Sequence, residues 1–235
     1  MLSAIQTMDL HYTYPDGTPA LNGFSCQIQK GECVGIVGPS GAGKSTLALC
    51  LSGLVLPQKG TILIGDQKLD RKNLKQLRSK VGLIFQNPDD QLFMPTLLED
   101  AAFGPLNQGF APAEAEARAR AAIEAVGLSG FERRSAYHAS EGQKRNASLA
   151  TILSMNVKLL LLDEPGAGLD FRSRRRLTEI LAGRGESMLM ATHDMDMVRA
   201  LCRQVILLDA GRVAAVGSVT EILDDAELLA LHGLA

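Results

Sequence analysis

The sequence of 235 residues contains no Trp, only three Tyr and seven Phe, and four Cys. The cysteines stand apart from one another, without a C-x-x-C pair, which is typical of buried, reduced thiols in a cytosolic protein. There is also no excess of basic residues, because Lys and Arg number 24 against 26 Asp and Glu. The charge balance therefore argues against a dedicated nucleic-acid-binding protein, and we expect no nucleic-acid partner.

Long hydrophobic runs are missing as well. A membrane-spanning helix needs roughly 18 consecutive apolar residues, whereas the best run, residues 47–56, is shorter and contains Ser52 and Gly53. The first residues have neither a basic segment nor a long apolar stretch, so no signal peptide is expected. With 46% apolar residues the chain is nevertheless rather hydrophobic, which indicates a large buried core or a surface that binds a partner.

The pattern that is present alternates short apolar runs with amphipathic segments, which predicts βα units and a mainly parallel sheet. We expect strands over residues 33–37, 61–64, 80–85, 159–163, 187–192, 205–208 and 213–216. Helices are expected over residues 44–54, 171–181 and 195–201 and in the tail from residue 220.

The stretch from about 88 to 156 differs in character and predicts a helical subdomain inserted between strands. Pro112 is placed to begin a helix and Gly127 to end one. Between them, two Glu–Arg pairs follow an i,i+4 spacing, Glu114 with Arg118 and Glu116 with Arg120. The later arginines of residues 172–176 are read as a solvated helix face with local ion pairs.

A phosphate-binding loop is the strongest local motif. Its eight residues match the pattern G-x-x-x-x-G-K-[ST] and lie between a predicted strand and a predicted helix: Gly38, Pro39, Ser40, Gly41, Ala42, Gly43, Lys44 and Ser45. Small residues let backbone N–H groups approach phosphate oxygens, and the helix that follows presents its N-terminus to the anion. Lys44 is expected to reach the β- and γ-phosphates and Ser45 to ligate Mg²⁺, with Thr46 beside them.

Two carboxylates end a run of four leucines, at Asp163 and Glu164. Asp163 is a candidate to hold Mg²⁺ through water, which would complete the site at the phosphate-binding loop. Glu164 is a candidate to orient or deprotonate an attacking water. His193 stands beside Asp194 and Asp196, which leaves open a less favoured interpretation as a metal site.

Further motifs follow in a fixed order. Gln86 comes after a predicted strand, Ser140-Glu141-Gly142-Gln143 precedes a predicted helix, and Asp163-Glu164-Pro165 is followed by Gly168-Leu169-Asp170 and by Thr192-His193-Asp194. Over essentially the whole chain this order resembles the ATP-binding cassette (ABC) family. The resemblance implies one ABC ATPase domain over residues 1–235, without an extra C-terminal domain. The implied fold is an α/β P-loop NTPase with a RecA-like parallel core, an antiparallel β subdomain and the inserted helical subdomain.

The resemblance also implies roles for single residues. Tyr14, in preference to Tyr12, would stack on adenine; Gln86 would touch Mg²⁺ or the water; and His193 would contact the γ-phosphate. Ser140, Glu141, Gly142 and Gln143 form the signature that would cap the nucleotide bound to a second copy, and Asp170 would link the two sites. The implied assembly is a head-to-tail dimer that ATP closes and hydrolysis releases.

Residues 85–107, with Phe85-Gln86-Asn87-Pro88 at their start, look most like the ATPases of energy-coupling-factor importers of the cobalt and nickel group. That branch implies a transmembrane coupling subunit and a substrate-binding membrane subunit, with this chain peripheral at the cytoplasmic face of the membrane. Phe93 and Met94 are candidates for contact with the coupling subunit or for burial in the chain's own core.

The signature departs from the family pattern. It reads Ala139-Ser140-Glu141-Gly142-Gln143, so a carboxylate stands where a triphosphate should dock, and Gly166 stands where the family usually has Thr or Ser. Alternatives therefore stay open: an importer of a vitamin such as biotin, a weakly hydrolysing regulatory module, or an ABC ATPase of DNA repair or translation.

Overall fold

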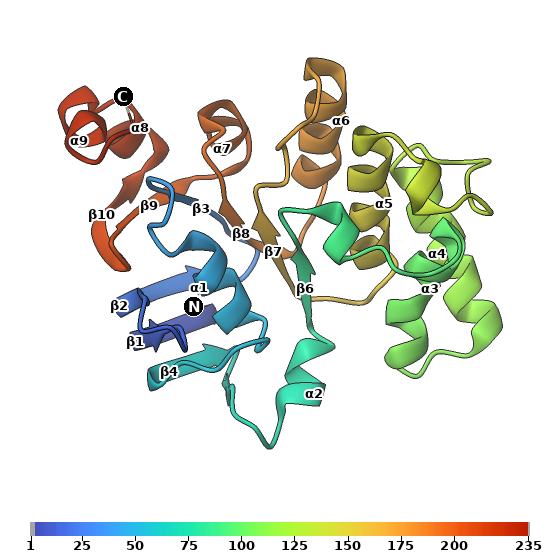
Figure 1. Ribbon diagram of the computed structural model, residues 1–235, viewed down its shortest axis with the longest axis horizontal. Helices are drawn as coiled ribbons and strands as arrows, with labels where there is room; N and C mark the ends of the chain where they lie inside the picture. Colours follow the sequence, from blue (N-terminus) through green and yellow to red (C-terminus); the bar gives the residue numbers. More distant parts are fainter. Residues whose placement is uncertain (1–2, 235) are drawn as a thin grey trace.

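The computed structural model describes residues 3–234 and divides their strands between two sheets (Figure 1). The strands are β1 (Ser3–Thr13), β2 (Pro19–Gln29), β3 (Cys33–Val37), β4 (Lys59–Ile64), β5 (Gln67–Lys68), β6 (Val81–Ile84), β7 (Leu159–Asp163), β8 (Ser187–Ala191), β9 (Gln204–Asp209) and β10 (Arg212–Ser218). The α-helices are α1 (Lys44–Leu51), α2 (Leu74–Arg78), α3 (Leu97–Asn107), α4 (Pro112–Ala125), α5 (Glu141–Leu153), α6 (Phe171–Ala182), α7 (Met195–Leu201), α8 (Val219–Leu223) and α9 (Ala226–Leu231). Two 3₁₀ turns lie at η1 (Pro88–Asp90) and η2 (Ala136–His138).

The central sheet has the order β10-β9-β3-β8-β7-β6, in which all neighbours are parallel except β10 with β9. Every residue of β3, β6, β7 and β8 is buried, as expected for near-continuous apolar strands covered on both faces. Because parallel strands end at the same edge, the segments after β3, β6, β7 and β8 converge there. This edge carries the phosphate-binding loop, Gln86, the two carboxylates and His193.

The second sheet is antiparallel, in the order β2-β1-β4-β5. Its apolar face and α1 share one core cluster with β3, β6, β7, β8 and β9. Strand β1 has an irregular register where Asp9 adopts a positive φ of 51°. At that point Gly60 lies so close that an added Cβ would sit 2.4 Å from the Asp9 carbonyl oxygen, so a side chain has no room there.

The segment between β6 and β7 contains only helices and loops and lies beside the central sheet (Figure 1). Pro112 is the first residue of α4, and Gly127 follows its end with φ 74°. Both predicted ion pairs form, from Arg118 to Glu114 at 3.0 Å and from Arg120 to Glu116 at 2.6 Å. Apolar residues of α3, α4 and α5 join the core cluster on the other face of the sheet. The division into domains stays a prediction.

Most predicted elements shift by only one or two residues at their ends, and two larger differences have a local cause. Helix α1 ends at Leu51, not at residue 54, because Gly53 turns the chain with φ 73°. The tail forms two short helices instead of one, since Asp225 accepts a hydrogen bond from the Leu228 amide (2.9 Å) and begins a new helix. Among residues 3–234 no helix combines the length and the apolar composition that a membrane span requires.

Candidate functional site

The phosphate-binding loop turns between β3 and α1 with two glycines in tight contact with the backbone of other segments. A Cβ added to Gly38 would lie 2.0 Å from the Leu208 carbonyl oxygen, and one added to Gly43 would lie 2.3 Å from that of Ala20. Any side chain at either position would force the loop away from the sheet. The glycines thus hold the loop where its N–H groups and the N-terminus of α1 can bind an anion.

A cavity of about 410 Å³ lies against this loop. Its lining includes most of the residues predicted to bind nucleotide and the neighbouring candidates: Tyr14, Ser40, Gly41, Ala42, Gly43, Lys44, Ser45, Thr46, Gln86, Asp163 and Glu164. The Tyr14 hydroxyl is 2.8 Å from the Thr46 hydroxyl, and its ring meets that of Tyr12 edge-on with centroids 5.1 Å apart. Tyr14 therefore lines the cavity, whereas Tyr12 packs behind it.

Lys44 is half-buried beside the two carboxylates. Its Nζ donates to the carbonyl oxygens of Gly38 at 2.6 Å and Pro39 at 2.9 Å. Burial lowers the pKa of the ammonium group, and the charges of Glu164 and Asp163 oppose that effect. The lysine is thus held by its own loop, in reach of a phosphate that approaches the cavity.

Asp163 ends β7 and is 7% exposed. Burial raises the pKa of its carboxyl, and Ser45 opposes the rise. Its Oδ1 atom is buried and has no hydrogen-bond partner among residues 3–234. A carboxylate oxygen that lacks a donor, next to a serine hydroxyl and a phosphate-binding loop, fits Mg²⁺, which prefers one or two carboxylates together with phosphate and water oxygens.

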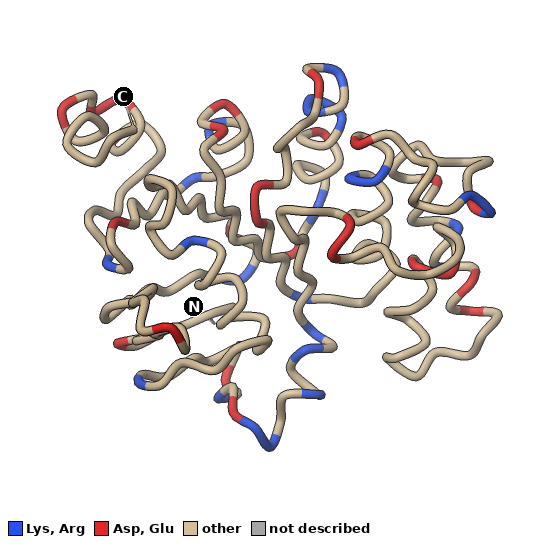
Figure 2. The backbone as a smooth tube through the Cα atoms, in the orientation of Figure 1, with Lys and Arg blue, Asp and Glu red and all other residues tan. Residues whose placement is uncertain are grey.

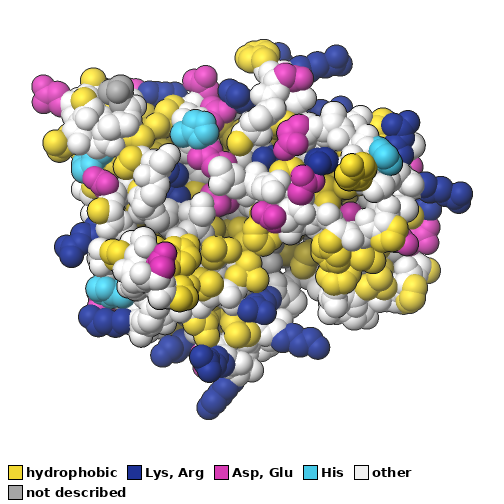
Figure 3. Space-filling view, viewed as in Figure 1, with side chains coloured by type: hydrophobic (Ala, Val, Ile, Leu, Met, Phe, Trp, Pro, Cys, Tyr) yellow, Lys and Arg dark blue, Asp and Glu magenta, His cyan; other side chains and the backbone are white. Residues whose placement is uncertain are grey.

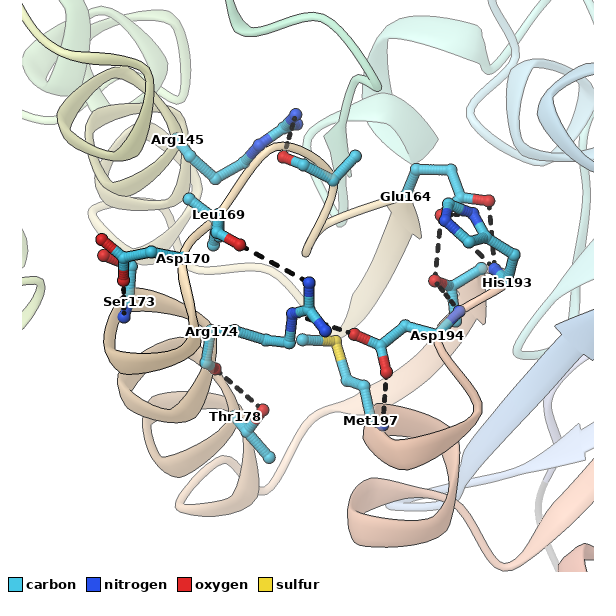
Figure 4. A network of polar contacts seen from close by, with 12 residues as sticks. Arg145, Glu164, Leu169, Asp170, Ser173, Arg174, Thr178, His193, Asp194 and Met197 are labelled. Atoms are coloured by element: carbon cyan, nitrogen blue, oxygen red, sulfur yellow. Dashed lines mark hydrogen bonds and ion pairs between the residues drawn. The ribbon is translucent and has the colours of Figure 1, made fainter.

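Glu164 lies beyond the strand end with a positive φ of 48°, and its carboxylate is held from two sides (Figure 4). Oε2 accepts a hydrogen bond from the Thr192 hydroxyl at 2.9 Å, and Oε1 accepts one from the His193 amide at 3.1 Å. The His193 Nδ1 atom is also 2.9 Å from Oε2, although 73% of the histidine side chain is exposed. Glu164 and His193, two residues with separately predicted roles, therefore meet directly. No group of three metal-ligating side chains occurs in the described part of the chain, around His193 or elsewhere.

The signature and Asp170 lie outside this cavity. Ser140 is the N-cap residue of α5. Its amide donates to the Gln143 side chain at 2.9 Å, and its hydroxyl accepts from the Gln143 amide at 3.3 Å, which forms a capping box. Glu141 is exposed. Asp170 begins α6, where the Ser173 amide donates to it at 2.7 Å and lowers the pKa of its carboxyl. Within one copy of the chain, these residues contribute nothing to the lining of the nucleotide cavity.

Sequence reasoning missed Arg145, which ties three of these segments together. The residue is 3% exposed, and its guanidinium donates to the carbonyl oxygens of Phe85 at 2.9 Å, Gln86 at 2.7 Å and Ala167 at 3.5 Å. A signal was available, because Arg145 occupies the same helix face as Leu149 and Ile152, both buried. A basic residue on an apolar face indicates buried carbonyl or carboxylate partners.

Comparison with known proteins supports the ABC resemblance that the sequence motifs indicate. A family model described as ABC transporter matches residues 21–167, and a model of an AAA domain matches residues 129–207. A Gloeobacter violaceus protein that is named as an ABC transporter ATP-binding protein is 48% identical in sequence. The alignment covers 100% of this chain and 97% of that protein. The energy-coupling factor transporter ATP-binding protein EcfA of Methanothermobacter thermautotrophicus is 42% identical, with 96% of this chain and 74% of that protein covered.

Solved structures agree with these sequence relatives. The structure of cbiO1 from Clostridium perfringens, described as part of the ABC transporter complex cbiONQ, superposes with a TM-score of 0.84 at 33% identity and covers 100% of this chain and 96% of that one. A dimeric ATP-binding cassette bound to ADP and phosphate also gives a TM-score of 0.84, at 26% identity over 92% of this chain and 98% of that one.

Proposed function

The chain belongs to the ABC transporter ATPase family, as the ATP-binding subunit of a transporter of the energy-coupling-factor type, and we propose that it powers uptake of a transition-metal ion. Cobalt is the proposed substrate and nickel the next candidate. The observation that carries the ATPase chemistry is the pair of carboxylates at the end of β7, of which one has an Oδ1 without a partner among residues 3–234 and the other is held by Thr192 and His193.

The phosphate-binding loop supplies the nucleotide contacts of this proposal. Residues Gly38–Thr46 bind the phosphates through backbone N–H groups and the Lys44 ammonium, and Tyr14 stacks on adenine. Ser45, Asp163 and Gln86 would hold Mg²⁺, which when bound neutralises charge on the β- and γ-phosphate oxygens. The fit of Asp163 to that ion is supported by its buried Oδ1, which no donor of the described chain satisfies.

Glu164 is the proposed general base. The Thr192 hydroxyl, the His193 amide and the His193 Nδ1 atom fix its carboxylate next to the cavity. In this position it can orient a water molecule and accept a proton from it. His193 has an exposed ring that can reach a γ-phosphate while Nδ1 stays on Glu164. Gln86 lines the same cavity and is the proposed sensor of the membrane partner.

The nucleotide site is proposed to be completed by a second copy of the chain. Ser140, Glu141, Gly142 and Gln143 are too far from their own cavity to line it, yet they begin a helix whose N-terminus favours an anion. In a head-to-tail dimer each signature faces the phosphate of the partner copy, and Asp170 lies between the two sites. Dimeric cassettes among the structural relatives support this arrangement.

The proposed docking patch for the transmembrane coupling subunit consists of Phe93, Phe103 and Leu106. These side chains are 62%, 43% and 46% exposed, and the rings of Phe93 and Phe103 meet edge-on with centroids 5.0 Å apart. Hydrophobic side chains gather over this region near α3 (Figure 3). Asp100 holds the turn before it, since its carboxylate accepts hydrogen bonds from the amides of Phe93 at 3.0 Å and Met94 at 2.9 Å.

The patch supports the proposal that the chain is a peripheral subunit at the cytoplasmic face of the membrane, next to a coupling subunit and a substrate-binding membrane subunit. An exposed apolar cluster fits contact with another protein. Apart from the basic stretch of residues 71–80 around α2, basic and acidic residues are interspersed along the backbone (Figure 2), and this near balance of charge favours protein contact over attraction to anionic lipid or nucleic acid.

The test of the transport role is purification of the tagged, full-length chain from membranes of its own host, with metal analysis of the complex. We expect two membrane proteins and bound cobalt or nickel; a complex that carries biotin or another vitamin instead would overturn the metal assignment. The docking patch is tested with Phe93→Asp, which should release the membrane proteins, while Leu231→Asp, at a residue 78% exposed on α9, should not.

The test of the enzymatic role compares ATP hydrolysis by the isolated chain and by Glu164→Gln. Loss of a general base lowers a rate by about 10²–10⁴-fold, and we expect a decrease of that order with nucleotide binding retained. Absence of hydrolysis in both proteins would support a regulatory module instead, an alternative that the carboxylate of Glu141 in the signature favours.

A further inference from the structure

Arg174 lies on α6 between the segment that contains Asp170 and the segment that contains His193 (Figure 4). Its Nε atom is 3.2 Å from the Asp194 Oδ2 atom, and its Nη2 atom donates to the Leu169 carbonyl oxygen at 3.5 Å. One guanidinium therefore contacts both the Leu169–Asp170 turn and the Thr192–Asp194 segment. Along the chain, α6 and β8 lie between these two segments.

From Asp194 a short series of hydrogen bonds leads to Glu164. The Asp194 amide donates to the Thr192 hydroxyl at 3.0 Å, and that hydroxyl donates to Glu164 Oε2 at 2.9 Å. The other carboxylate oxygen of Asp194, Oδ1, caps the N-terminus of α7, because it accepts a hydrogen bond from the Met197 amide at 3.1 Å. Asp194 thus joins two features: its carboxylate caps α7, and its backbone amide contacts the Thr192 hydroxyl that donates to Glu164.

Arg174 and Asp194 depend on each other. The Arg174 Nε and Asp194 Oδ2 atoms are both buried, and in residues 3–234 neither has a hydrogen-bond partner apart from this ion-pair contact. Gly166 leaves room beside them for a small side chain: a Cβ there would lie 3.5 Å from Asp194 Oδ2 and 3.1 Å from Met197 Cε, so the end of the flexible Met197 side chain would have to move by a few tenths of an ångström. The Arg174 side chain is 43% exposed and that of Asp194 12%, so the Asp194 carboxylate is the partner with less access to water and depends more on the contact.

We propose that Arg174 is a positioning residue for hydrolysis that couples the Leu169–Asp170 turn to the Glu164 carboxylate through Asp194 and Thr192. The inference rests on the proposed role of Glu164 as general base. Arg174 does not line the nucleotide cavity, so it acts on the rate of the chemical step and leaves ATP binding unchanged. If contact with a second copy displaces the Leu169–Asp170 turn, the Arg174 guanidinium moves with it. That movement changes the position of Asp194 and of the hydrogen-bond donors on Glu164.

The experiment measures kcat and KM for ATP together with the thermal midpoint of the full-length chain. Arg174→Gln should lower kcat about tenfold and change KM by less than about twofold, in the range of coupling effects measured for residues away from a ligand. Arg174→Lys, which keeps the charge on Asp194 but has one ammonium in place of the guanidinium, should give an intermediate kcat. The matched control is Arg175→Gln, because Arg175 is 73% exposed and pairs only locally with Glu179; it should match the wild-type chain.

A second variant separates coupling from local stability. Gly166→Ser in the Arg174→Gln chain offers a hydroxyl to Asp194 without restoring the contact with Leu169. We expect the thermal midpoint to recover while kcat stays low, and Gly166→Ser alone to hydrolyse ATP at nearly the wild-type rate. Recovery of kcat together with the midpoint, or a wild-type kcat in Arg174→Gln, would overturn the proposal while the ATPase assignment stands. Absence of hydrolysis in the wild-type chain would overturn both.

Discussion

At the scale of single residues, two adjacent carboxylates have opposite surroundings. Asp163 is buried with an unpartnered oxygen, and burial raises the pKa of its carboxyl. Glu164 accepts hydrogen bonds from Thr192 and His193. Environment divides the roles of such pairs in enzymes: the unsatisfied oxygen suits a cation, and the fixed carboxylate suits a water molecule.

Asp163→Asn should stabilise the nucleotide-free chain and abolish Mg²⁺-dependent hydrolysis. The folded-state pKa of Asp163 is raised, so its ionised form destabilises the fold above that pKa, and the penalty disappears as the pH falls and the carboxyl takes up a proton. The free energy of unfolding should rise by about 1 kcal/mol near neutral pH, and the difference should shrink towards about pH 4. Thermal or urea unfolding measures it.

Asp170→Ala is a control variant for which the expected change in the free energy of unfolding has the opposite sign. The Ser173 amide lowers the pKa of the Asp170 carboxyl, so the ionised form stabilises the fold above the ordinary pKa, and that contribution is lost as the pH falls through the folded value. This variant should be less stable than the wild-type chain, because it removes the N-cap acceptor of α6. If Asp163→Asn also destabilised the chain near neutral pH, the interpretation of its unsatisfied oxygen would be wrong.

Glu141 is the residue of the signature that departs most from the family pattern, and it is exposed at the start of α5. A carboxylate there repels a triphosphate held by a second copy. Glu141→Gly should therefore raise the ATPase rate of the isolated chain, by about twofold to fivefold at low salt, with a smaller effect when salt screens the charge. Glu141→Gln removes the charge at nearly constant size and should act alike; an unchanged or lower rate in both would refute the argument.

At the scale of elements, the loop after β6 and helix α5 are held as one unit. Arg145 donates to the carbonyl oxygens of Phe85 and Gln86, Gln91 donates to the Ser148 carbonyl oxygen at 2.9 Å, and Lys144 lies 2.6 Å from Asp89. Because α5 begins with the signature and the loop begins with Gln86, movement of one moves the other. The contacts link the proposed membrane-sensing loop to the face that is proposed to meet a second copy.

Arg145→Met tests that unit. The substitution keeps an apolar side chain on the buried face but leaves carbonyl oxygens of residues 85, 86 and 167 without their donor, which should lower the free energy of unfolding by about 2–4 kcal/mol. Urea denaturation measures the loss. Arg133→Met, at an exposed arginine, should change stability by less than about 0.5 kcal/mol. Equal, small effects of both variants would contradict the interpretation.

The elements also show what a sequence reveals and what it hides. The buried parallel strands β3 and β7 were predictable, since each is a continuous apolar run. Strands β1 and β2 were not delimited, because polar residues and the irregular register near Asp9 interrupt their alternation. The phosphate-binding loop is a local pattern and could be found, whereas Arg145 contacts Phe85 from 60 residues away, a separation that no local pattern encodes.

At the scale of the whole molecule, the nucleotide cavity contains the residues for binding and proton transfer but not the signature. One copy thus carries the nucleotide cavity, one half of the proposed site, on one face and the signature, the other half, on another face. A nucleotide that contacts both halves makes its full set of bonds only in the closed dimer, so its binding free energy favours closure. In the proposed cycle, hydrolysis would remove the bridging phosphate and reopen the dimer, and the membrane subunits would respond to it.

The most direct measurement of this account is the molar mass of the Glu164→Gln chain in solution, by light scattering, with and without ATP and Mg²⁺. Since this variant should bind but not hydrolyse ATP, we predict that nucleotide doubles its mass. The further change Gly142→Asp fits the fold, because a Cβ there makes only ordinary contacts at 3.6 and 3.7 Å, and the added charge on the signature should keep the chain monomeric. A Glu164→Gln chain that binds ATP and remains monomeric, or a Gly142→Asp double variant that dimerises equally well, would contradict the shared site.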